Sequence, residues 1–230
     1  MSGTEPGPPA PDAAPELRER LAPVLDLLAS DPASLSSVRD RDDAWRVHVV
    51  DSLSGLAAVG TPARVADVGA GAGFPGLVLA AALPETRVDL IESVRRKCDF
   101  IERAIAAAGL ENASVVCERA ETWAAADGRE AYDVVTARAV GRLSTLAELA
   151  SPLLVDGGAL VAWKGRRDPD EEAELSRAEP RTAMRLERVD AVGEVAGFEH
   201  RHLHLVRKVG PTPAGLPRRP GMAKKRPFGS

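Results

Sequence analysis

The chain has 230 residues, a net charge of −4 and a sequence pI of about 5.7. This length fits one sizeable domain with appendages, and a hydrophobic content of 44% excludes general disorder. No apolar run approaches the ~18–20 residues that a membrane helix requires, and the N-terminus lacks the features of a secretion signal. Cys98 and Cys117 are too few for a disulfide framework, so we expect reduced cysteines in a cytoplasmic protein.

The N-terminal part of the chain changes character twice. Residues 1–15 are rich in proline, glycine and alanine and are expected to form a disordered leader. Apolar residues then recur at helical spacing over 16–30 and again over 45–56, which predicts a helical extension spanning 16–60. From residue 64 onward, short apolar strands alternate with helices. This alternation indicates βαβ units and a parallel sheet with helices on both faces.

The main domain is expected to span residues 61–209 and to hold a sheet of seven strands. The five clear strands are Val65–Val68, Val88–Ile91, Ser114–Val116, Asp133–Ala137 and Ala159–Trp163, and two weaker ones lie around Met184–Val192 and His202–Lys208. The intervening helices are Gly76–Leu83, Arg95–Ala108 and Leu143–Leu154. Residues 210–230 are rich in proline and glycine, and we expect them to form an extended tail.

Charge is distributed unevenly along the chain. Eight basic residues and no acid follow Glu199, which leaves a net charge of −12 on the preceding 199 residues. An acidic body with a basic tail favours an anionic partner.

A glycine-rich turn follows the first strand and opens a helix. Glycines at alternate positions let the backbone adopt positive φ and let a ligand approach closely. Gly71 and Gly76 would fit a dinucleotide fingerprint, but Gly69 directly follows the strand, so the turn begins with Asp67, two residues before that glycine. An acid there is awkward beside a pyrophosphate and well placed for an ammonium group. The turn, with Gly73, therefore favours S-adenosylmethionine over NAD.

Further candidate residues end the other strands, and strand ends face the crevice in which open α/β sheets bind ligands. Glu92 ends the second strand and can accept from both ribose hydroxyls of a nucleoside. The loop at Ala120 and Glu121 is expected to border the adenine. Arg138 and Lys164 end two central strands and would give the crevice a positive lining that could hold an RNA phosphate.

Histidines gather near the C-terminal end. His200, His202 and His204 would share one face of a strand, which could suit a metal ion. No Cys, Asp or Glu cluster accompanies them, so we expect no metal site.

At several points the residues resemble a known family, the small-subunit ribosomal RNA (guanine-N7) methyltransferases, also called glucose-inhibited division protein B. The similarity runs from about Leu35 to the C-terminus. The resembling stretches are Trp45-x-x-His48-x-x-Asp51-Ser52-Leu53, Asp67 to Gly76 with its Phe74-Pro75-Gly76 ending, Glu118 to Glu121, Arg138-Ala139, Lys164-Gly165 and Pro217 to Pro227. Ser34 to Arg39 departs from the Trp-Asn and Asn-Leu-Thr usual in the family.

The resemblance implies a Rossmann-like class I methyltransferase fold, S-adenosylmethionine as cofactor and 16S rRNA, free or in the small ribosomal subunit, as substrate. The enzyme would be a monomer without a metal. The cofactor site would be lined by Gly69 and Phe74, with Glu92 at the ribose, Ala120 and Glu121 at the adenine, and Arg138 completing the pocket. Guanine N7 carries a lone pair and no proton, so an in-line displacement of the methyl group requires no general base.

Two questions stay open at the level of sequence. His48, Asp51 and Ser52 match family positions, and their role is either functional or confined to packing a helix over the sheet. The function could also differ: a NAD-linked oxidoreductase, a non-catalytic RNA-binding module on the same fold, or a methyltransferase for another acceptor.

Overall fold

The structure is a computed structural model that describes residues 15–31, 35–36, 38, 40–193 and 200–230. Almost all of the expected leader therefore lies outside the described residues. Within the described ranges, no helix is both long and apolar enough to cross a membrane.

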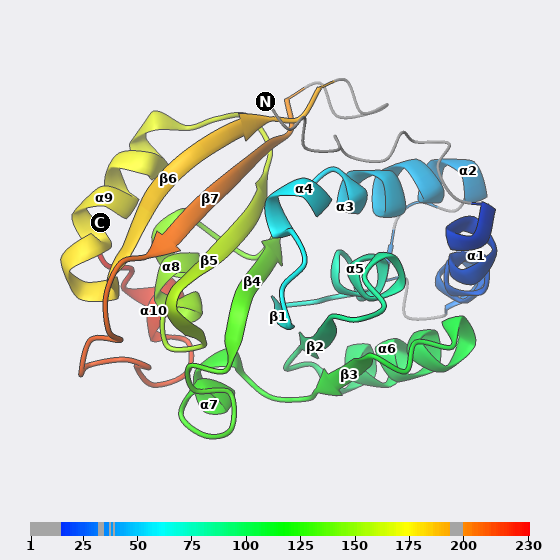
Figure 1. The fold of residues 1–230 in the computed structure, drawn as a ribbon, viewed down its shortest axis with the longest axis horizontal. Helices are drawn as coiled ribbons and strands as arrows, with labels where there is room; N and C mark the ends of the chain where they lie inside the picture. Colours follow the sequence, from blue (N-terminus) through cyan, green and yellow to red (C-terminus); the bar gives the residue numbers. More distant parts are fainter. Residues whose placement is uncertain (1–14, 32–34, 37, 39, 194–199) are drawn as a thin grey trace, which may run out of the picture.

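Seven strands form one sheet in the order β3-β2-β1-β4-β5-β7-β6 (Figure 1). The pairs from β3 to β5 are parallel, whereas β7 is antiparallel to both β5 and β6. The strands are β1 (Arg64–Val68), β2 (Arg87–Ile91), β3 (Ala113–Val116), β4 (Tyr132–Arg138), β5 (Leu154–Lys164), β6 (Met184–Ala191) and β7 (His202–Lys208). The predicted seven-stranded, mostly parallel sheet is thus confirmed.

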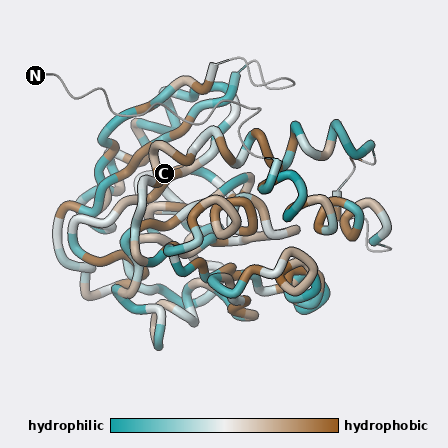
Figure 2. Tube along the Cα trace, turned by 45° about the vertical axis from the view of Figure 1, so that its right-hand side comes forward, coloured by the Kyte–Doolittle hydropathy of each residue, from teal (hydrophilic) through white to brown (hydrophobic). Residues whose placement is uncertain are grey.

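Helices cover both faces of the sheet (Figure 1). Strand residues alternate between two apolar clusters: Val65 packs with α1, α5 and α6, whereas its neighbour Ala66 packs with α7, α8 and α9. Figure 2 shows the hydrophobic segments concentrated in the interior strands and the helix faces against them. The helices of the main domain are α5 (Gly76–Ala82), α6 (Arg95–Ala108), α7 (Ala120–Ala124), α8 (Leu143–Ala150) and α9 (Pro169–Thr182).

The N-terminal extension consists of α1 and a chain of short helices. Helix α1 packs on α5 and α6, so it adds to the helices on that side of the sheet. The following short helices include a π-helix, η1, that carries His48. Their bounds are α1 (Pro15–Ser30), α2 (Arg41–Ala44), η1 (Trp45–Val50), α3 (Asp51–Leu53) and α4 (Leu56–Val59).

Local signals explain where several elements begin and end. Helix α6 ends at Gly109, whose φ of +59° gives the left-handed cap that glycine adopts most easily. Helix α9 begins after Asp168, whose carboxylate accepts hydrogen bonds from the amides of Asp170 and Glu171. The sequence reasoning did not predict α7 or α9, and it extended α8 to Leu154, where β5 already begins.

Residues 210–230 differ from the extended tail that we expected. They fold back over α8 and α9 and form a short helix, α10 (Met222–Lys225). Phe228 is buried with Ala178 and Leu216 in a small apolar cluster, and the carbonyl of Gly229 accepts from Arg177 of α9. Burial of the phenyl ring stabilises the packing of this segment on α9.

Candidate active site

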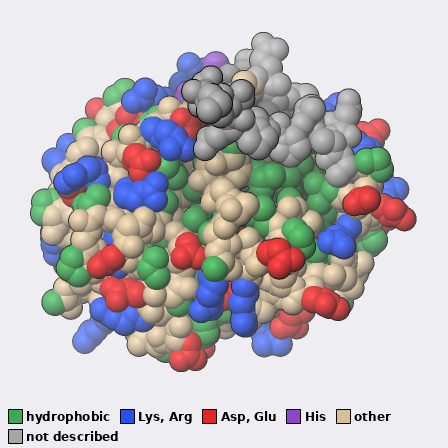
Figure 3. Space-filling model, in the orientation of Figure 1, with side chains coloured by type: hydrophobic (Ala, Val, Ile, Leu, Met, Phe, Trp, Pro, Cys, Tyr) green, Lys and Arg blue, Asp and Glu red, His purple; other side chains and the backbone are tan. Residues whose placement is uncertain are grey.

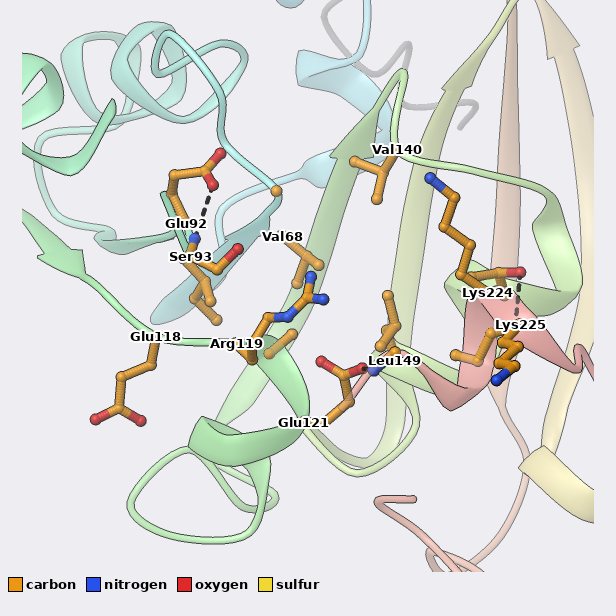
Figure 4. A pocket seen from close by; sticks show the side chains of 16 residues that line it. Val68, Glu92, Ser93, Glu118, Arg119, Glu121, Val140, Leu149, Lys224 and Lys225 are labelled. Carbon is orange, nitrogen blue, oxygen red and sulfur yellow. Dashed lines mark hydrogen bonds between the residues drawn. The ribbon is translucent and has the colours of Figure 1, made fainter. Parts of the chain in front are cut away.

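A cavity of about 400 Å³ opens at the carboxyl edge of the parallel strands (Figure 4). This size lies within the range of ~300–1,000 Å³ typical of small-molecule sites. Parallel strands place their carboxyl ends at one edge, so the ends of β1 and β2 and the loop after β3 meet there. The lining residues are Val68, Gly69, Ile91, Glu92, Ser93, Glu118, Arg119, Ala120, Glu121, Val140, Thr145, Leu149, Gly221, Ala223, Lys224 and Lys225.

Four of the predicted cofactor residues, Gly69, Glu92, Ala120 and Glu121, line this cavity. The other predicted residues lie nearby but do not line it: Asp67, Gly71, Gly73, Phe74 and Arg138. Thr145, Leu149 and the C-terminal residues from Gly221 to Lys225 were missed. The only signal for the last group was the similarity of Pro217–Pro227 to the family.

The glycine turn requires glycine at two positions for steric reasons. Gly69 has a φ of +69°, and a Cβ atom there would meet a methyl group of Val140 at 2.8 Å. Gly73 has a φ of +90°, and its Cβ would collide with the side chain of Leu77. Side chains at these positions would strain the backbone and push on the β4–α8 loop or on α5.

Asp67 is fully buried beneath the turn. One carboxylate oxygen accepts from the amide of Gly76 at 2.9 Å, and the other accepts from Thr136 Oγ1 at 3.0 Å. Burial raises the pKa of Asp67 to about 6, against the lowering effect of these hydrogen bonds and of Arg138. The carboxylate therefore fastens the start of α5 to β4 through these two internal donors.

Glu92 connects the end of β2 to the glycine turn. Its Oε2 accepts from the amide of Gly71 at 3.1 Å, and its Oε1 accepts from the amides of Ser93 and Val94. These contacts hold the carboxylate in one orientation at the wall of the cavity, where its remaining lone pairs can meet a ribose. The position fits the predicted role of Glu92.

Glu121 is held by the C-terminal segment. Its Oε1 accepts a hydrogen bond of 2.7 Å from the amide of Gly221, a residue 100 positions later in the chain. The segment is itself fixed to α8, because Thr145 Oγ1 donates to the carbonyl of Ala223 and Arg218 forms a forked ion pair with the buried Glu148. The C-terminal segment is thus one wall of the cavity.

Arg138 lies beside the cavity in a buried network around Asp51. Its Nη1 is 2.7 Å from Asp51 Oδ2, and Arg201 contacts the same carboxylate through Nε at 2.7 Å and Nη2 at 3.0 Å. Burial lowers the pKa of Arg138, while Asp51 raises it. The backbone carbonyl of Asp51 also accepts from Trp163 Nε1. Asp51 therefore ties α3 to β4, β5 and the start of β7.

His48 and Phe74 stack next to this network. Their ring centroids are 4.8 Å apart with an interplanar angle of 18°, and Arg138 lies 5.9 Å from the Phe74 centroid. Burial and the charge of Arg138 lower the pKa of His48 to about 4, so its imidazole is neutral at pH 7. Nε2 is 2.9 Å from Ser36 Oγ, and buried Nδ1 has no hydrogen-bond partner among the described residues. His48 thus holds η1 against Phe74, at the end of the glycine turn.

Lys164 is engaged by neighbouring groups rather than open to the crevice. Its ammonium lies 2.6 Å from Glu171 Oε1 and donates to the carbonyl of Gly141 at 2.9 Å. Lys164, Arg201 and Trp163 line a second cavity of about 350 Å³. Lys164 therefore stabilises the loop between β4 and α8.

Two histidines of the C-terminal part contact a carboxylate or backbone carbonyls. His204 Nε2 is 3.2 Å from Glu172, and burial lowers the pKa of His204. His202 Nδ1 lies 3.0 Å from the carbonyl oxygens of Gly165 and His200. Among the described residues, no group of three or more His, Cys, Asp or Glu side chains could hold a metal ion.

The expectation of reduced cysteines is wrong for this structure. Cys98 and Cys117 form a disulfide whose Cα atoms are 5.8 Å apart. Cys98 lies near the start of α6 and Cys117 directly after β3, so the bond joins the two segments that follow Glu92 and precede Ala120.

Solved structures with this fold are methyltransferases and related transferases. A structure titled as a SAM dependent methyltransferase from Aquifex aeolicus superposes with a TM-score of 0.60 at 18% identity, covering 78% of this chain and 99% of that one. MtNAS in complex with S-adenosylmethionine superposes with a TM-score of 0.54 at 14% identity, covering 84% of this chain and 73% of that one. The protein has the Rossmann-like class I methyltransferase fold, with the glycine turn and the strand-end acids at its carboxyl edge.

The sequence comparisons name the family. The family model GidB, described as rRNA small subunit methyltransferase G, matches residues 25–204. A protein of Roseiflexus castenholzii named ribosomal RNA small subunit methyltransferase G is 42% identical over 85% of this chain and 84% of its own length. A protein of the same name from Thermotoga neapolitana is 37% identical over 91% of both chains. The chain belongs to the rRNA small subunit methyltransferase G family, which confirms the resemblance and makes the protein an S-adenosylmethionine-dependent methyltransferase.

Proposed function

We propose that the protein transfers a methyl group from S-adenosylmethionine to N7 of a guanine in 16S rRNA. The observation that carries this proposal is the cavity at the carboxyl edge, where Gly69, Glu92 and Glu121 converge in a chain of this family. Its size suits a nucleoside-containing cofactor. Because the relatives are named for small-subunit rRNA, a ribosomal acceptor is favoured over a small molecule or a protein.

The residues around the cavity fit S-adenosylmethionine in three places. Gly69 exposes backbone next to the end of β1. A Cβ atom built on Gly71 would have, among the described residues, only the carbonyl oxygen of Gly69 within 4 Å. Glu92 offers its carboxylate to the ribose. Ala120 and Glu121 border the adenine. Glu121 Oε1 accepts from the amide of Gly221, and Oε2 can accept a hydrogen bond from the amino group of the adenine. Three further residues do not line the cavity but fix the conformation of the glycine turn: Asp67, Gly73 and Phe74.

The chemical step needs positioning rather than proton transfer. The bound cofactor supplies an electrophilic methyl group, and guanine N7 attacks it with a lone pair that carries no proton. The chain must therefore align the acceptor within ~3–3.5 Å of the methyl group and exclude competing geometries. A neutral His48 stacked on Phe74 suits this region, because positive charge moves onto the guanine during the transfer.

Arg138 and Lys164 are proposed as positioning residues. Arg138 holds Asp51, and through it the η1–α3 segment, against the glycine turn. Lys164 holds the carbonyl of Gly141 in the loop that follows β4. Both side chains are paired with carboxylates of the protein, so they fix the shape of the crevice rather than contact the acceptor directly.

The protein is further proposed to act as a monomer in the cytoplasm. Ribosomal subunits, the proposed substrate, occur in that compartment.

The test is labelled methyl transfer to small ribosomal subunits that lack native N7 methylation, followed by nucleoside analysis. Label recovered as 7-methylguanosine in 16S rRNA is the expected result. The variant Glu92→Gln should lose most cofactor affinity, whereas Glu102→Gln, an exposed acid on α6, should bind and react as the wild type does. Cofactor binding without label in the rRNA would move the proposal to another acceptor.

A further inference from the structure

The ion pairs divide the basic residues of the C-terminal part into two groups. Arg201, Arg207, Lys208 and Arg218 each contact a carboxylate of the main domain or of η1–α3. These four cations are neutralised locally. The remaining four all lie between residues 219 and 226, at and around α10.

Lys224 and Lys225 belong to the second group and line the cofactor cavity, as does Arg119 from the loop before α7. All three side chains are exposed, and within the part of the chain that the structure describes none of them has an ion-pair partner. A Cβ atom on Gly221 would lie 3.9 Å from Arg119 Nη2, so Arg119 reaches across to the C-terminal segment. Figure 4 shows the side chains of Arg119 and Lys224 extending into the space between the two walls.

The cofactor does not explain these three charges. The adenosine part of S-adenosylmethionine is uncharged, and its only carboxylate belongs to the amino-acid end. Two of the three acids that line the cavity are already engaged: Glu92 with three backbone amides and Lys97, and Glu121 with the amide of Gly221. The third, Glu118, is exposed and points away from Arg119 (Figure 4). Three exposed cations at one rim attract an anion from outside the protein.

The segment that carries the lysines is held in place rather than free. Phe228 lies between two guanidinium groups, with Arg181 at 3.8 Å and Arg218 at 3.9 Å from its ring centroid. Arg218 is paired with the buried Glu148, and it also donates to the carbonyl of Arg226 at 2.8 Å. The lysines therefore stand at a fixed place on the rim of the cavity.

We propose that Arg119, Lys224 and Lys225 bind the phosphate backbone of the RNA substrate beside the cofactor cavity. This inference rests on the proposed function and names the residues that contact the acceptor. It moves the phosphate contact away from Arg138 and Lys164, whose charges are neutralised by Asp51 and Glu171. Figure 3 shows acidic and basic side chains interspersed over the face that it displays, so a local cationic rim can direct the RNA without a basic surface overall.

The experiment compares wild type with the double variant Lys224→Gln/Lys225→Gln and with Arg119→Gln. Glutamine has a helix propensity similar to that of lysine, keeps a polar end group and removes the charge. The KM for small ribosomal subunits should rise about tenfold in the double variant, with kcat at saturation and the Kd for S-adenosylmethionine within twofold of wild type. The slope of log Kd against log salt concentration should fall in magnitude by about 0.7–0.9 per lysine removed.

Arg20→Gln is the matched control, because Arg20 is an exposed cation on α1 that forms no ion pair with any of the described residues. It should leave the KM and the salt slope unchanged. An unchanged KM and slope in the double variant would overturn the proposal. A weaker Kd for S-adenosylmethionine by the same factor would overturn it too, because the cations would then serve the cofactor.

Binding of the subunits is measured separately in the presence of S-adenosylhomocysteine, where no turnover occurs. This arm separates the two proposals. If wild type transfers no methyl group to rRNA, the proposed function fails, while the binding data still report whether the three cations hold RNA.

Discussion

Asp51 illustrates how single residues hold this site together. A fully buried carboxylate costs several kcal/mol unless it is paired and hydrogen-bonded, and here two guanidinium groups meet it from β4 and from the residue before β7. The charges compensate one another inside the protein. As a result, a residue that could have been only a packing element fixes the geometry next to the cavity.

His48 predicts a pH dependence at the same scale. Its pKa of about 4 in the folded state lies below the ordinary value of 6.5, so between these values the unfolded chain binds a proton that the native state does not. His48 thus contributes stability that is complete above pH 6.5 and is lost as the pH falls toward 4.

We expect the difference in unfolding free energy between wild type and His48→Gln to grow by about 1–2 kcal/mol from pH 4.5 to pH 7. Urea unfolding at several pH values measures this difference. Asp67, with its pKa raised to about 6, has the opposite effect, but it is present in both proteins and cancels. A difference that stays constant with pH would show that His48 keeps its ordinary pKa.

Among the secondary-structure elements, helix α6 is linked to the loop after β3 because the Cys98–Cys117 disulfide joins them. The two cysteines are 19 positions apart, and the segment between them contains most of α6 and all of β3. Closing such a loop removes conformational entropy from the unfolded chain, an effect of about 3 kcal/mol. The bond therefore stabilises the wall that carries Glu92 and Ala120.

The corresponding prediction concerns heat stability. Replacing both cysteines, Cys98→Ser/Cys117→Ser, should lower the Tm by about 6–12 °C, and the wild type under reducing conditions should melt close to the variant. Differential scanning calorimetry with and without reductant measures both. Mass spectrometry after alkylation counts the free thiols, and two alkylated thiols in the untreated protein would contradict the disulfide.

For the molecule as a whole, the C-terminal segment completes a cavity whose other walls come from residues 68–149. Phe228 anchors this segment, since its ring is buried between Arg181 and Arg218. The amide of Gly221 then reaches Glu121, and Ala223 closes the cavity. In the proposed function, cofactor binding is thereby coupled to the docking of residues far from the glycine turn.

We expect Phe228→Ala to weaken S-adenosylmethionine binding about five- to tenfold, because loss of a buried ring costs several kcal/mol and would let the segment detach. Phe228→Tyr keeps the ring and should restore binding. Val209→Ala, at a residue exposed by 43%, is the control that should change neither affinity nor Tm. Isothermal calorimetry measures the affinity, and full affinity after proteolytic loss of the segment would contradict the coupling.

The sequence predicted the strands of the sheet well and the charged residues of the site poorly. Strands such as β1 and β2 are short apolar runs that only a buried strand explains, and both were placed within one residue. Helix α9 was missed because its charged residues and Pro180 hide the apolar face that packs on the sheet. The partner of Arg138 lies 87 residues away, so no spacing in the sequence indicates it.

What the sequence alone determined is what depends on near neighbours: the alternation of strands and helices, the turn that needs Gly69 and Gly73, and the acid that ends β2. These features follow from backbone conformation and periodicity, which act over a few residues. Only the tertiary structure decided which cations stay unpaired, where Asp67 directs its carboxylate, and how the basic C-terminal segment folds. Those outcomes depend on which distant groups meet after burial, because a charge that leaves water must find its partner wherever the fold provides one.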